Sequence, residues 1–264
     1  MADPARQMAE PRDARARFRA AARAAGLDPD DPWVGGYADY ERNHLRPLLG
    51  VYGIDPAGLA ALEFGCNVGA SSVVLARLGA QVTGVDVSEP HVRLAEANIA
   101  LHGLERRARA QHVPDTSALP FADGAFDMAL ANSVLEYVDP AQLAWVVGEL
   151  HRVLRPGATL LVCGTASRLA PREVHSRAWL TNYVPRFVDP LLGSSPQRGL
   201  SPWALARALR GRFVVTRAGD WLAARRVLHG RASLPVRLVD ALGRTTGVAP
   251  GWLGPHIELV LRRL

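Results

Sequence analysis

Short apolar runs alternate with longer amphipathic stretches through the middle of the chain. The apolar runs predict strands at 59–64, 81–87, 108–113, 126–131 and 159–163. The stretches between them predict helices at 71–78, 89–101 and 140–154. Short apolar strands separated by helices of this length are typical of a parallel sheet with helices on both faces. The central part of the chain is therefore expected to form an α/β domain.

The segments on either side of this alternation are less regular. Before it, the segment from residue 1 to about 30 is expected to form a polar helix that ends at Gly26. A second helix is expected over 40–52. After it, the pattern predicts an irregular or helical insertion. The later elements are expected as an insertion at 165–200, a helix at 202–209, a strand at 213–217, a helical insertion at 221–242 and a strand at 256–264.

The charge of the chain changes this picture little. The net charge is +6, and all 31 basic residues are arginine. An absence of lysine is typical of a GC-rich genome and does not by itself indicate a phosphate-binding face. The one arginine cluster, at 12–23, is interpreted as a solvated basic helix in preference to a nucleic-acid arm. We therefore do not expect nucleic acid as a partner.

Cysteine content and hydropathy restrict the class of protein further. Cys66 and Cys163 are the only cysteines and neither has a CxxC partner, so we expect neither a disulfide nor a zinc site. No apolar run approaches the roughly 20 residues that a membrane span needs. Residues 1–23 lack the apolar core of a secretory signal. The expected location is cytoplasmic.

The strongest chemical signal is the sequence ALEFGCNVG at 61–69, where the first strand ends. Gly65 and Gly69 frame a tight turn in which backbone can approach a ligand closely. The helix that follows directs its first N–H groups into the crevice at the carboxyl ends of the strands. Glu63 suits a cationic amino group, and Asp86, twenty-one residues after Gly65, can accept from both hydroxyls of a ribose.

The spacing of this turn distinguishes two kinds of cofactor site. A dinucleotide fingerprint would need glycine at 67 and 70, where the chain has Asn67 and Ala70. The pattern E-x-G-x-x-x-G instead resembles motif I of class I methyltransferases. Glycine is usual in that family where Asn67 stands, but asparagine tolerates left-handed backbone better than most residues.

Further motifs follow in the order of the same family. They are D-x-x-x-L-P-F at 115–121, FD at 126–127, NSVLEY at 132–137 and LHRVLRPGATLL at 150–161. Together they resemble the small-molecule methyltransferases of ubiquinone and menaquinone biosynthesis, the methyltransferase type 11 domain. The resemblance covers about two-fifths of the chain, and Ala158 replaces the second glycine of the last motif. It implies a mostly parallel, seven-stranded Rossmann-like α/β sheet with N-terminal helices and an insertion after the fifth strand.

The resemblance also implies S-adenosylmethionine (SAM) as the cofactor. In the family, the residue matching Asp115 accepts from the adenine amino group and the backbone at Thr116 reads the ring edge. The residues expected at the cofactor are Glu63, Gly65, Cys66, Asn67, Gly69, Asp86, Val87, Asp115, Thr116 and Asn132. We divide the chain into an N-terminal helical cap on the substrate side, 1–55, and a SAM-binding methyltransferase domain, 56–264, with insertions at about 165–200 and 221–254.

The acceptor side is defined less sharply by the sequence. Methyl transfer from a sulfonium is an in-line displacement, and a general base is needed only where the nucleophile must lose a proton. His175 is the preferred candidate base, with His44 and Glu136 as further candidates, although surface or structural roles remain open for them. Candidate substrate contacts are Tyr37, Tyr40, Trp179 and Tyr183. The aromatic spacing at 179, 183 and 187 is also compatible with a core of the insertion itself.

The expected function is methylation of a small-molecule acceptor, with O-methylation favoured over N- or C-methylation and no metal. Two alternatives stay open. The chain could be an RNA or protein methyltransferase that docks through its basic N-terminal helix, or a SAM-binding module without catalytic activity. A dehydrogenase is a more distant alternative because the glycine fingerprint fails.

Overall fold

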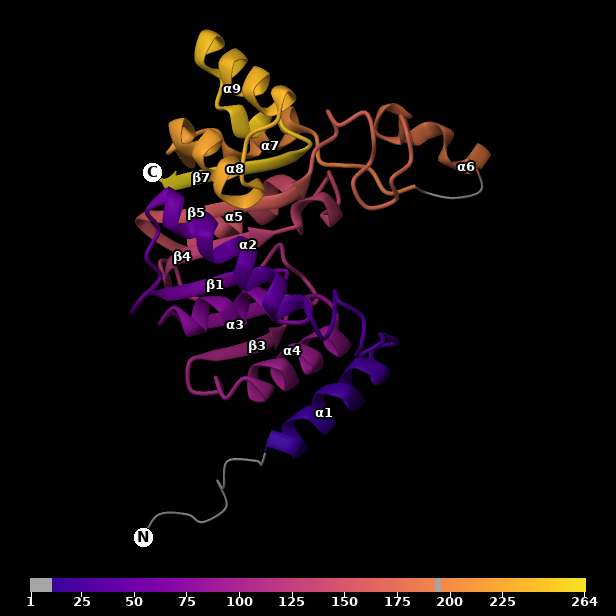
Figure 1. The fold of residues 1–264 in the computed structure, drawn as a ribbon, viewed down its shortest axis with the longest axis vertical. Coiled ribbons are helices and arrows are strands. Elements are labelled where there is room, and N and C mark those ends of the chain that lie inside the picture. Colours follow the sequence, from indigo (N-terminus) through magenta and orange to yellow (C-terminus); the bar gives the residue numbers. More distant parts are fainter. Residues whose placement is uncertain (1–10, 193–195) are drawn as a thin grey trace.

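A central seven-stranded sheet organises the molecule in the computed structural model, which describes residues 11–192 and 196–264 (Figure 1). The strands are β1 Ala60–Phe64, β2 Gln81–Asp86, β3 Ala108–His112, β4 Phe126–Asn132, β5 Leu154–Ala166, β6 Phe213–Thr216 and β7 His256–Arg263. Their order is β3-β2-β1-β4-β5-β7-β6. Strands β1 to β5 pair in parallel, whereas β7 runs antiparallel to both β5 and β6. The predicted mostly parallel, seven-stranded α/β sheet is confirmed.

Helices cover both faces of this sheet. They are α1 Pro11–Ala24, α2 Tyr37–Tyr52, α3 Ala70–Arg77, α4 Glu89–Leu101, α5 Leu143–Val153, α6 Asp189–Leu192, α7 Pro202–Leu209, α8 Trp221–His229 and α9 Leu234–Thr246. Side chains of α5 and α7 join one face of β1, β4 and β5 in a buried cluster. Side chains of α2, α3 and α8 cover the opposite face. Because successive residues of a strand point to opposite faces, both clusters draw on the same strands.

Three differences from the predicted elements bear on the pocket or on the elements around it. Helix α2 begins at Tyr37, three residues early, and so includes the aromatic side chains that precede the predicted start. Strand β5 begins at Leu154, because Leu154 pairs with Phe126 across an irregularity in the β4–β5 ladder. The predicted insertion at 221–242 is two helices, since Gly230 (φ +75°) ends α8.

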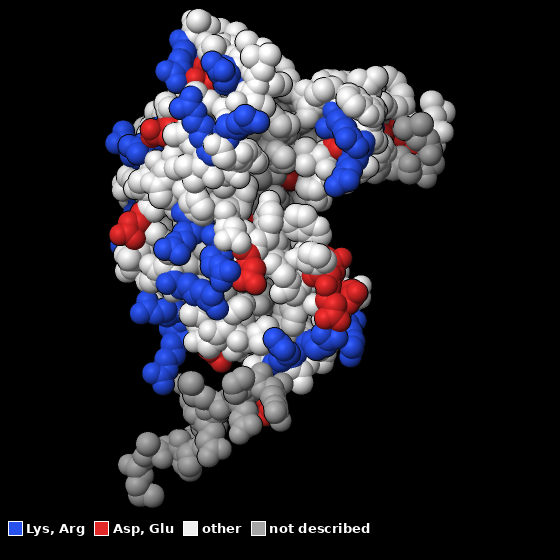
Figure 2. Space-filling model, in the orientation of Figure 1, with Lys and Arg blue, Asp and Glu red and all other residues white. Residues whose placement is uncertain are grey.

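The N-terminal helix packs along one face instead of standing free in solvent. Phe18 and Ala22 are buried in a cluster with Leu94 of α4, while Arg15 and Arg23 are exposed. Residues 1–10 of the predicted helix lie outside the described residues. Figure 2 shows arginine side chains in several separate groups across the visible face, with acidic side chains between them. Among the described helices, none is long and apolar enough to cross a membrane.

The segment after β5 leaves the body of the sheet as an arm and returns to it beside Leu200 (Figure 1). It buries several polar side chains: the Asn182 amide donates to the carbonyl of Ala170 at 2.8 Å, and Arg198 pairs with Asp189 at 3.0 Å. Trp179, by contrast, is 68 % exposed. The prediction that the aromatic residues form a core of this insertion is wrong, because the segment is not a continuous helix and their four-residue spacing does not align them.

Candidate active site

One large pocket opens where the parallel strands end. Its volume is about 1120 Å³, which exceeds the range of roughly 300–1000 Å³ that is usual for a single small-molecule site. All the predicted cofactor residues except Gly69 line it. Of the other predicted site residues, Tyr37, Tyr40, His44 and His175 also line it. The remaining candidates, Glu136, Trp179 and Tyr183, do not form its wall.

The glycine turn after β1 is built from three left-handed residues. Gly65 and Gly69 have φ +75°, and Asn67 between them has φ +46°. Asn67 therefore adopts a left-handed backbone where glycine is usual, as the tolerance of asparagine for this region predicts. A Cβ on Gly65 would lie 2.1 Å from Cγ2 of Val134, so no other residue fits there. Gly69 has a packing role instead, because a Cβ there would lie 2.9 Å from Ala95 of α4.

Asp86 at the end of β2 is fixed by backbone donors. The N–H of Asn67 donates to Oδ2 and the N–H of Ser88 donates to Oδ1, both at 2.9 Å. Each carboxylate oxygen keeps free lone-pair capacity, since an ionised carboxylate accepts about four hydrogen bonds. The glycine turn and the ribose candidate are thus joined into one rigid unit.

Two buried carboxylates face the pocket beside this turn. Glu63 accepts a hydrogen bond from the Ser72 hydroxyl, and burial raises the pKa of Glu63 to about 8. Burial also raises the pKa of Glu41 to about 7, although the Asn132 amide donates to its Oε1 at 3.0 Å. The second Glu41 oxygen is buried and has no hydrogen-bond partner among the described residues. A cationic group at this position would favour ionisation of both carboxyl groups.

Glu41 is a site residue that the sequence prediction missed. It lies on the buried face of α2, in line with Ala38, Leu45 and Leu48. A single acidic residue on the apolar stripe of an amphipathic helix is unusual, because a charge is rarely buried without a partner. That pattern, read from the helix periodicity, was the signal that could have identified it.

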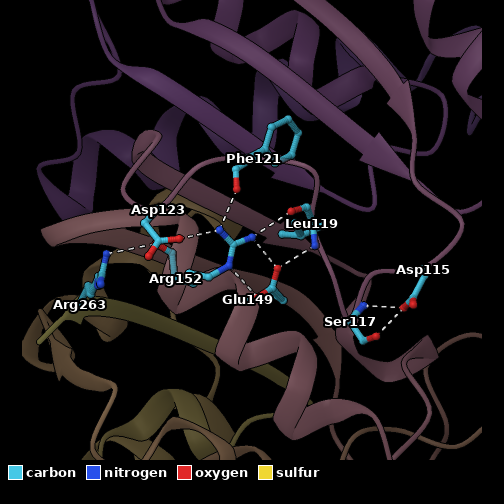
Figure 3. A network of polar contacts seen from close by, with 8 residues as sticks. All are labelled: Asp115, Ser117, Leu119, Phe121, Asp123, Glu149, Arg152 and Arg263. Atoms are coloured by element: carbon cyan, nitrogen blue, oxygen red, sulfur yellow. Dashed lines mark hydrogen bonds and ion pairs between the residues drawn. The ribbon is translucent and has the colours of Figure 1, made fainter.

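The loop that carries Asp115 is held by an arginine of a different motif (Figure 3). Arg152, from LHRVLRPG, donates to the carbonyls of Leu119 at 2.9 Å and Phe121 at 2.7 Å. Glu149 on the same helix orients this guanidinium and accepts from the N–H of Leu119 at 2.7 Å. The D-x-x-x-L-P-F and R-V-L-x-P-G motifs therefore form one structural unit, with Asp115 at its pocket end.

His175, from the insertion, pairs with a carboxylate from the β4–α5 connection. Its Nε2 lies 3.2 Å from Oε1 of Glu136, whose side chain is fully buried. The N–H of Ala166 donates to the same oxygen at 3.1 Å. The hydrogen bond to Glu136 raises the pKa of His175. Two of the three candidate catalytic residues thus form a pair, with only the imidazole in the pocket wall.

A second group of polar residues comes from α2, α8 and β7. We call it the histidine–arginine cluster: His44, Arg225, His229 and His256, all in the pocket wall. Glu258 pairs with Arg225 and accepts from the Tyr52 hydroxyl at 2.6 Å. Burial, and then the charge of Arg225, lower the pKa of His44 to about 4 and also lower the pKa of His256. The sequence prediction did not select Arg225, His229, His256 or Glu258.

Tyr40 of α2 stacks on His44 with ring centroids 5.5 Å apart, and Trp33 and Tyr37 extend this aromatic wall. No group of three or more His, Cys, Asp or Glu side chains is arranged to hold a metal in the part of the chain that the structure describes. Organic ligands with apolar and charged parts are thus the occupants that this pocket suits.

Comparison with known proteins agrees with this geometry. A family described as "Methyltransferase domain" matches residues 62–162. The chain is 34 % identical to a malonyl-[acyl-carrier protein] O-methyltransferase of Pseudescherichia vulneris, over 54 % of this chain and 52 % of that protein. It is 30 % identical to a ubiquinone biosynthesis O-methyltransferase of Maricaulis maris, over 56 % and 58 %. The chain thus spans about half the length of these relatives.

Solved structures share the fold over most of the chain. A SAM-dependent methyltransferase from Mesorhizobium loti superposes with a TM-score of 0.52 at 21 % identity, covering 82 % of this chain and 96 % of that one. The [4+2]-cyclase SpnF superposes with a TM-score of 0.53 at 23 % identity, covering 83 % and 80 %. Since proteins named for different reactions share this architecture, the fold alone does not define the chemistry.

Residues 62–162 match a methyltransferase domain, and the seven-stranded sheet has the Rossmann-like fold of SAM-dependent methyltransferases of known structure. Over about half of its length, the chain is similar to small-molecule methyltransferases such as the ubiquinone biosynthesis O-methyltransferases. The matched methyltransferase domain implies SAM as the cofactor. The donor set fits this molecule: the buried, unpartnered oxygen of Glu41 suits its ammonium group, and the free lone pairs of Asp86 suit its ribose.

Proposed function

We propose that this protein transfers the methyl group of SAM to a hydroxyl group of a small-molecule acceptor. The observation that carries the proposal is the pair of His175 and Glu136, which opens into the same pocket as the glycine turn and Asp86. A hydroxyl becomes an effective nucleophile when a base removes its proton, so a carboxylate-oriented imidazole suits O-methylation. The two relatives described above are both named O-methyltransferases, which supports the same choice.

The cofactor part of the pocket would be divided among three groups of residues. Glu63 and Glu41 would bind the ammonium group of the methionine portion. Asp86 would accept from the ribose hydroxyls, and Asp115 with the backbone at Thr116 would recognise the adenine. Each assignment follows from charge and position in the pocket wall. Bound in this way, SAM supplies an activated methyl group on a sulfonium.

The acceptor hydroxyl would give its proton to Nδ1 of His175, while Nε2–H donates to Glu136. The oxygen forms a bond to the methyl carbon as the carbon–sulfur bond breaks, and the electron pair remains on sulfur in S-adenosylhomocysteine (SAH). Glu136 would stabilise the imidazolium and fix the ring orientation, since its Oε1 is itself held by the N–H of Ala166. Proximity of the two reactants supplies much of the remaining rate enhancement.

The proposal is tested by SAH release with a panel of hydroxylated small molecules. With an acceptor that is turned over, His175→Gln should lower kcat by about 10²- to 10⁴-fold, the usual contribution of a general base. SAH affinity should stay within about twofold, because His175 does not contribute to the cofactor part of the pocket. Wild-type turnover by His175→Gln, or no SAH release with any hydroxylated acceptor, would contradict the proposal.

Glu136→Gln gives a second, independent readout. Neutral His175 is the active form, so kcat/KM should rise with pH as His175 loses its proton. The hydrogen bond that His175 donates to Glu136 raises the pKa of His175 in the native protein. Replacing the carboxylate with an amide should lower that pKa and move the acidic limb of the pH profile to lower pH. An acidic limb at the same pH in both proteins would show that Glu136 does not act on the base.

A further inference from the structure

We propose that the histidine–arginine cluster binds an anionic group, a carboxylate or a phosphate, on the methyl acceptor. The inference rests on the proposed function and names the substrate class for it. His44 comes from α2, Arg225 and His229 from α8, and His256 from the first position of β7. All four line the same pocket as the cofactor residues, and the charge of Arg225 contributes to the lowered pKa values of His44 and His256.

Arg225 has donor capacity beyond the bond that holds it. Its Nη2 pairs with Glu258, and Glu258 is fixed in turn by the Tyr52 hydroxyl. A guanidinium has five N–H donors in a planar fork, which matches the oxygens of a carboxylate or phosphate. The Nε of Arg225 is buried and has no hydrogen-bond partner within the described parts of the chain. An anion in the pocket would supply acceptors that this guanidinium otherwise lacks.

The charge balance of the cluster also favours an anion over other groups. Glu258 offsets the charge of Arg225, so the cluster carries no net excess of negative charge. Burial and Arg225 hold the pKa of His44 to about 4, so this imidazole is neutral near pH 7. An anion beside His44 and His256 would raise both pKa values, because a negative charge favours the protonated imidazoles. Protonation of either imidazole would then strengthen the binding of the anion. A cationic acceptor would meet Arg225, and a neutral apolar one would leave these donors unsatisfied.

The cluster lies close to the proposed base. His175 and His256 both line this pocket, and the charge of His175 is among the causes that lower the pKa of His256. The anionic group and the methylated hydroxyl would therefore belong to one compact acceptor, such as a hydroxylated carboxylic acid or a hydroxylated phosphate ester. Anchoring the anion would orient the hydroxyl toward His175.

Binding of simple probes to the SAH-saturated protein tests this inference without any turnover. The probes are 4-hydroxybenzoate, 4-hydroxyphenyl phosphate and the uncharged 4-hydroxybenzamide. Binding is followed by NMR from the Cε1–H signals of the histidines. At least one anionic probe should bind tenfold or more tightly than the amide and shift His44, His229 and His256, while His102 and His112 stay in place. The tighter of the two anionic probes identifies carboxylate or phosphate as the group.

A matched pair of variants on one helix isolates the residue responsible. Arg225→Gln should remove the preference for the anionic probe, whereas Arg226→Gln, exposed and outside the pocket wall, should keep it. If loss of the partner of Glu258 prevents Arg225→Gln from folding, His229→Asn replaces it and should weaken the anionic probe about threefold or more. Equal binding of amide and anions, or equal losses in both arginine variants, would overturn the inference. Since no methyl transfer is measured, failure of the proposed function would appear separately, as absent SAH release.

Discussion

The two parts of the pocket are built in different ways. Most of the cofactor part is assembled at the ends of β1, β2 and β3 and in the loops that follow them, and Glu41 of α2 completes it. The histidine–arginine cluster is assembled from α2, α8 and β7, and its central contact joins Tyr52 to Glu258, 206 residues apart. One part is acidic and the other contains arginine and imidazole. The difference suggests that a fixed cofactor requires local, repeated motifs, whereas the acceptor is recognised by long-range packing.

If the two parts of the pocket are independent, damage to the glycine turn should weaken SAH binding and leave binding at the histidine–arginine cluster unchanged. Gly65→Ala places a Cβ 2.1 Å from Cγ2 of Val134 at φ +75°. Overpacking costs about 1–3 kcal/mol and left-handed backbone about 1–2 kcal/mol more. SAH affinity should fall by at least tenfold, measured by calorimetry, with a lower free energy of unfolding. Gly58→Ala is the control, because Gly58 has φ +77° but nothing within 4 Å of its Cβ position.

A smaller effect is expected at Asp86. Asp86→Ala should cost about 1.5–3 kcal/mol of SAH binding, or about ten- to a hundredfold in Kd, because a charge-assisted bidentate contact is lost. Asp86→Asn keeps one acceptor oxygen, so its SAH affinity should lie between those of the wild type and Asp86→Ala. The affinity of the anionic probe should be unchanged in both variants. Unchanged SAH affinity in Asp86→Ala would remove the ribose assignment.

The smallest effect should come from a residue that acts at a distance. Arg152→Gln removes the bonds to the carbonyls of Leu119 and Phe121 and should loosen the loop that carries Asp115. SAH affinity should fall about three- to tenfold, since each such bond contributes about 1 kcal/mol. Arg155→Gln, which loses a more exposed ion pair, should change it less than twofold. Equal effects in the two variants would show that the loop does not depend on Arg152.

The same contrast explains what the sequence could predict. The sheet and the placement of Asp86, Asn67 and Asp115 in the pocket wall follow from local patterns, because each residue lies at the end of a predicted strand or within three residues of it. Glu41, by contrast, resembles any acidic residue on a helix until the helix register is known. Nothing near Arg225 in the sequence indicates its partner, which lies 33 residues away on β7.

In the insertion, the sequence prediction selected residues that do not line the pocket. The spacing of Trp179 and Tyr183 indicates one face only if the backbone between them is helical, and it forms short turns instead. Trp179 is exposed and Tyr183 donates to the carbonyl of Leu169 at 2.7 Å, so neither side chain reaches the pocket wall. His175 from the same segment does reach it, because its carboxylate partner Glu136 is held at the end of β4.

The reversed direction of β7 has a consequence for how such an enzyme can diversify. In the parallel strands, the last residues stand at the pocket edge, whereas in β7 the first residues do. The chain between α8 and β7 therefore leaves the pocket edge at His229 and returns to it at His256, and its length can change without altering the register of any strand. This stretch can therefore be replaced in evolution, and the acceptor changed, while the residues that bind the methyl donor stay the same.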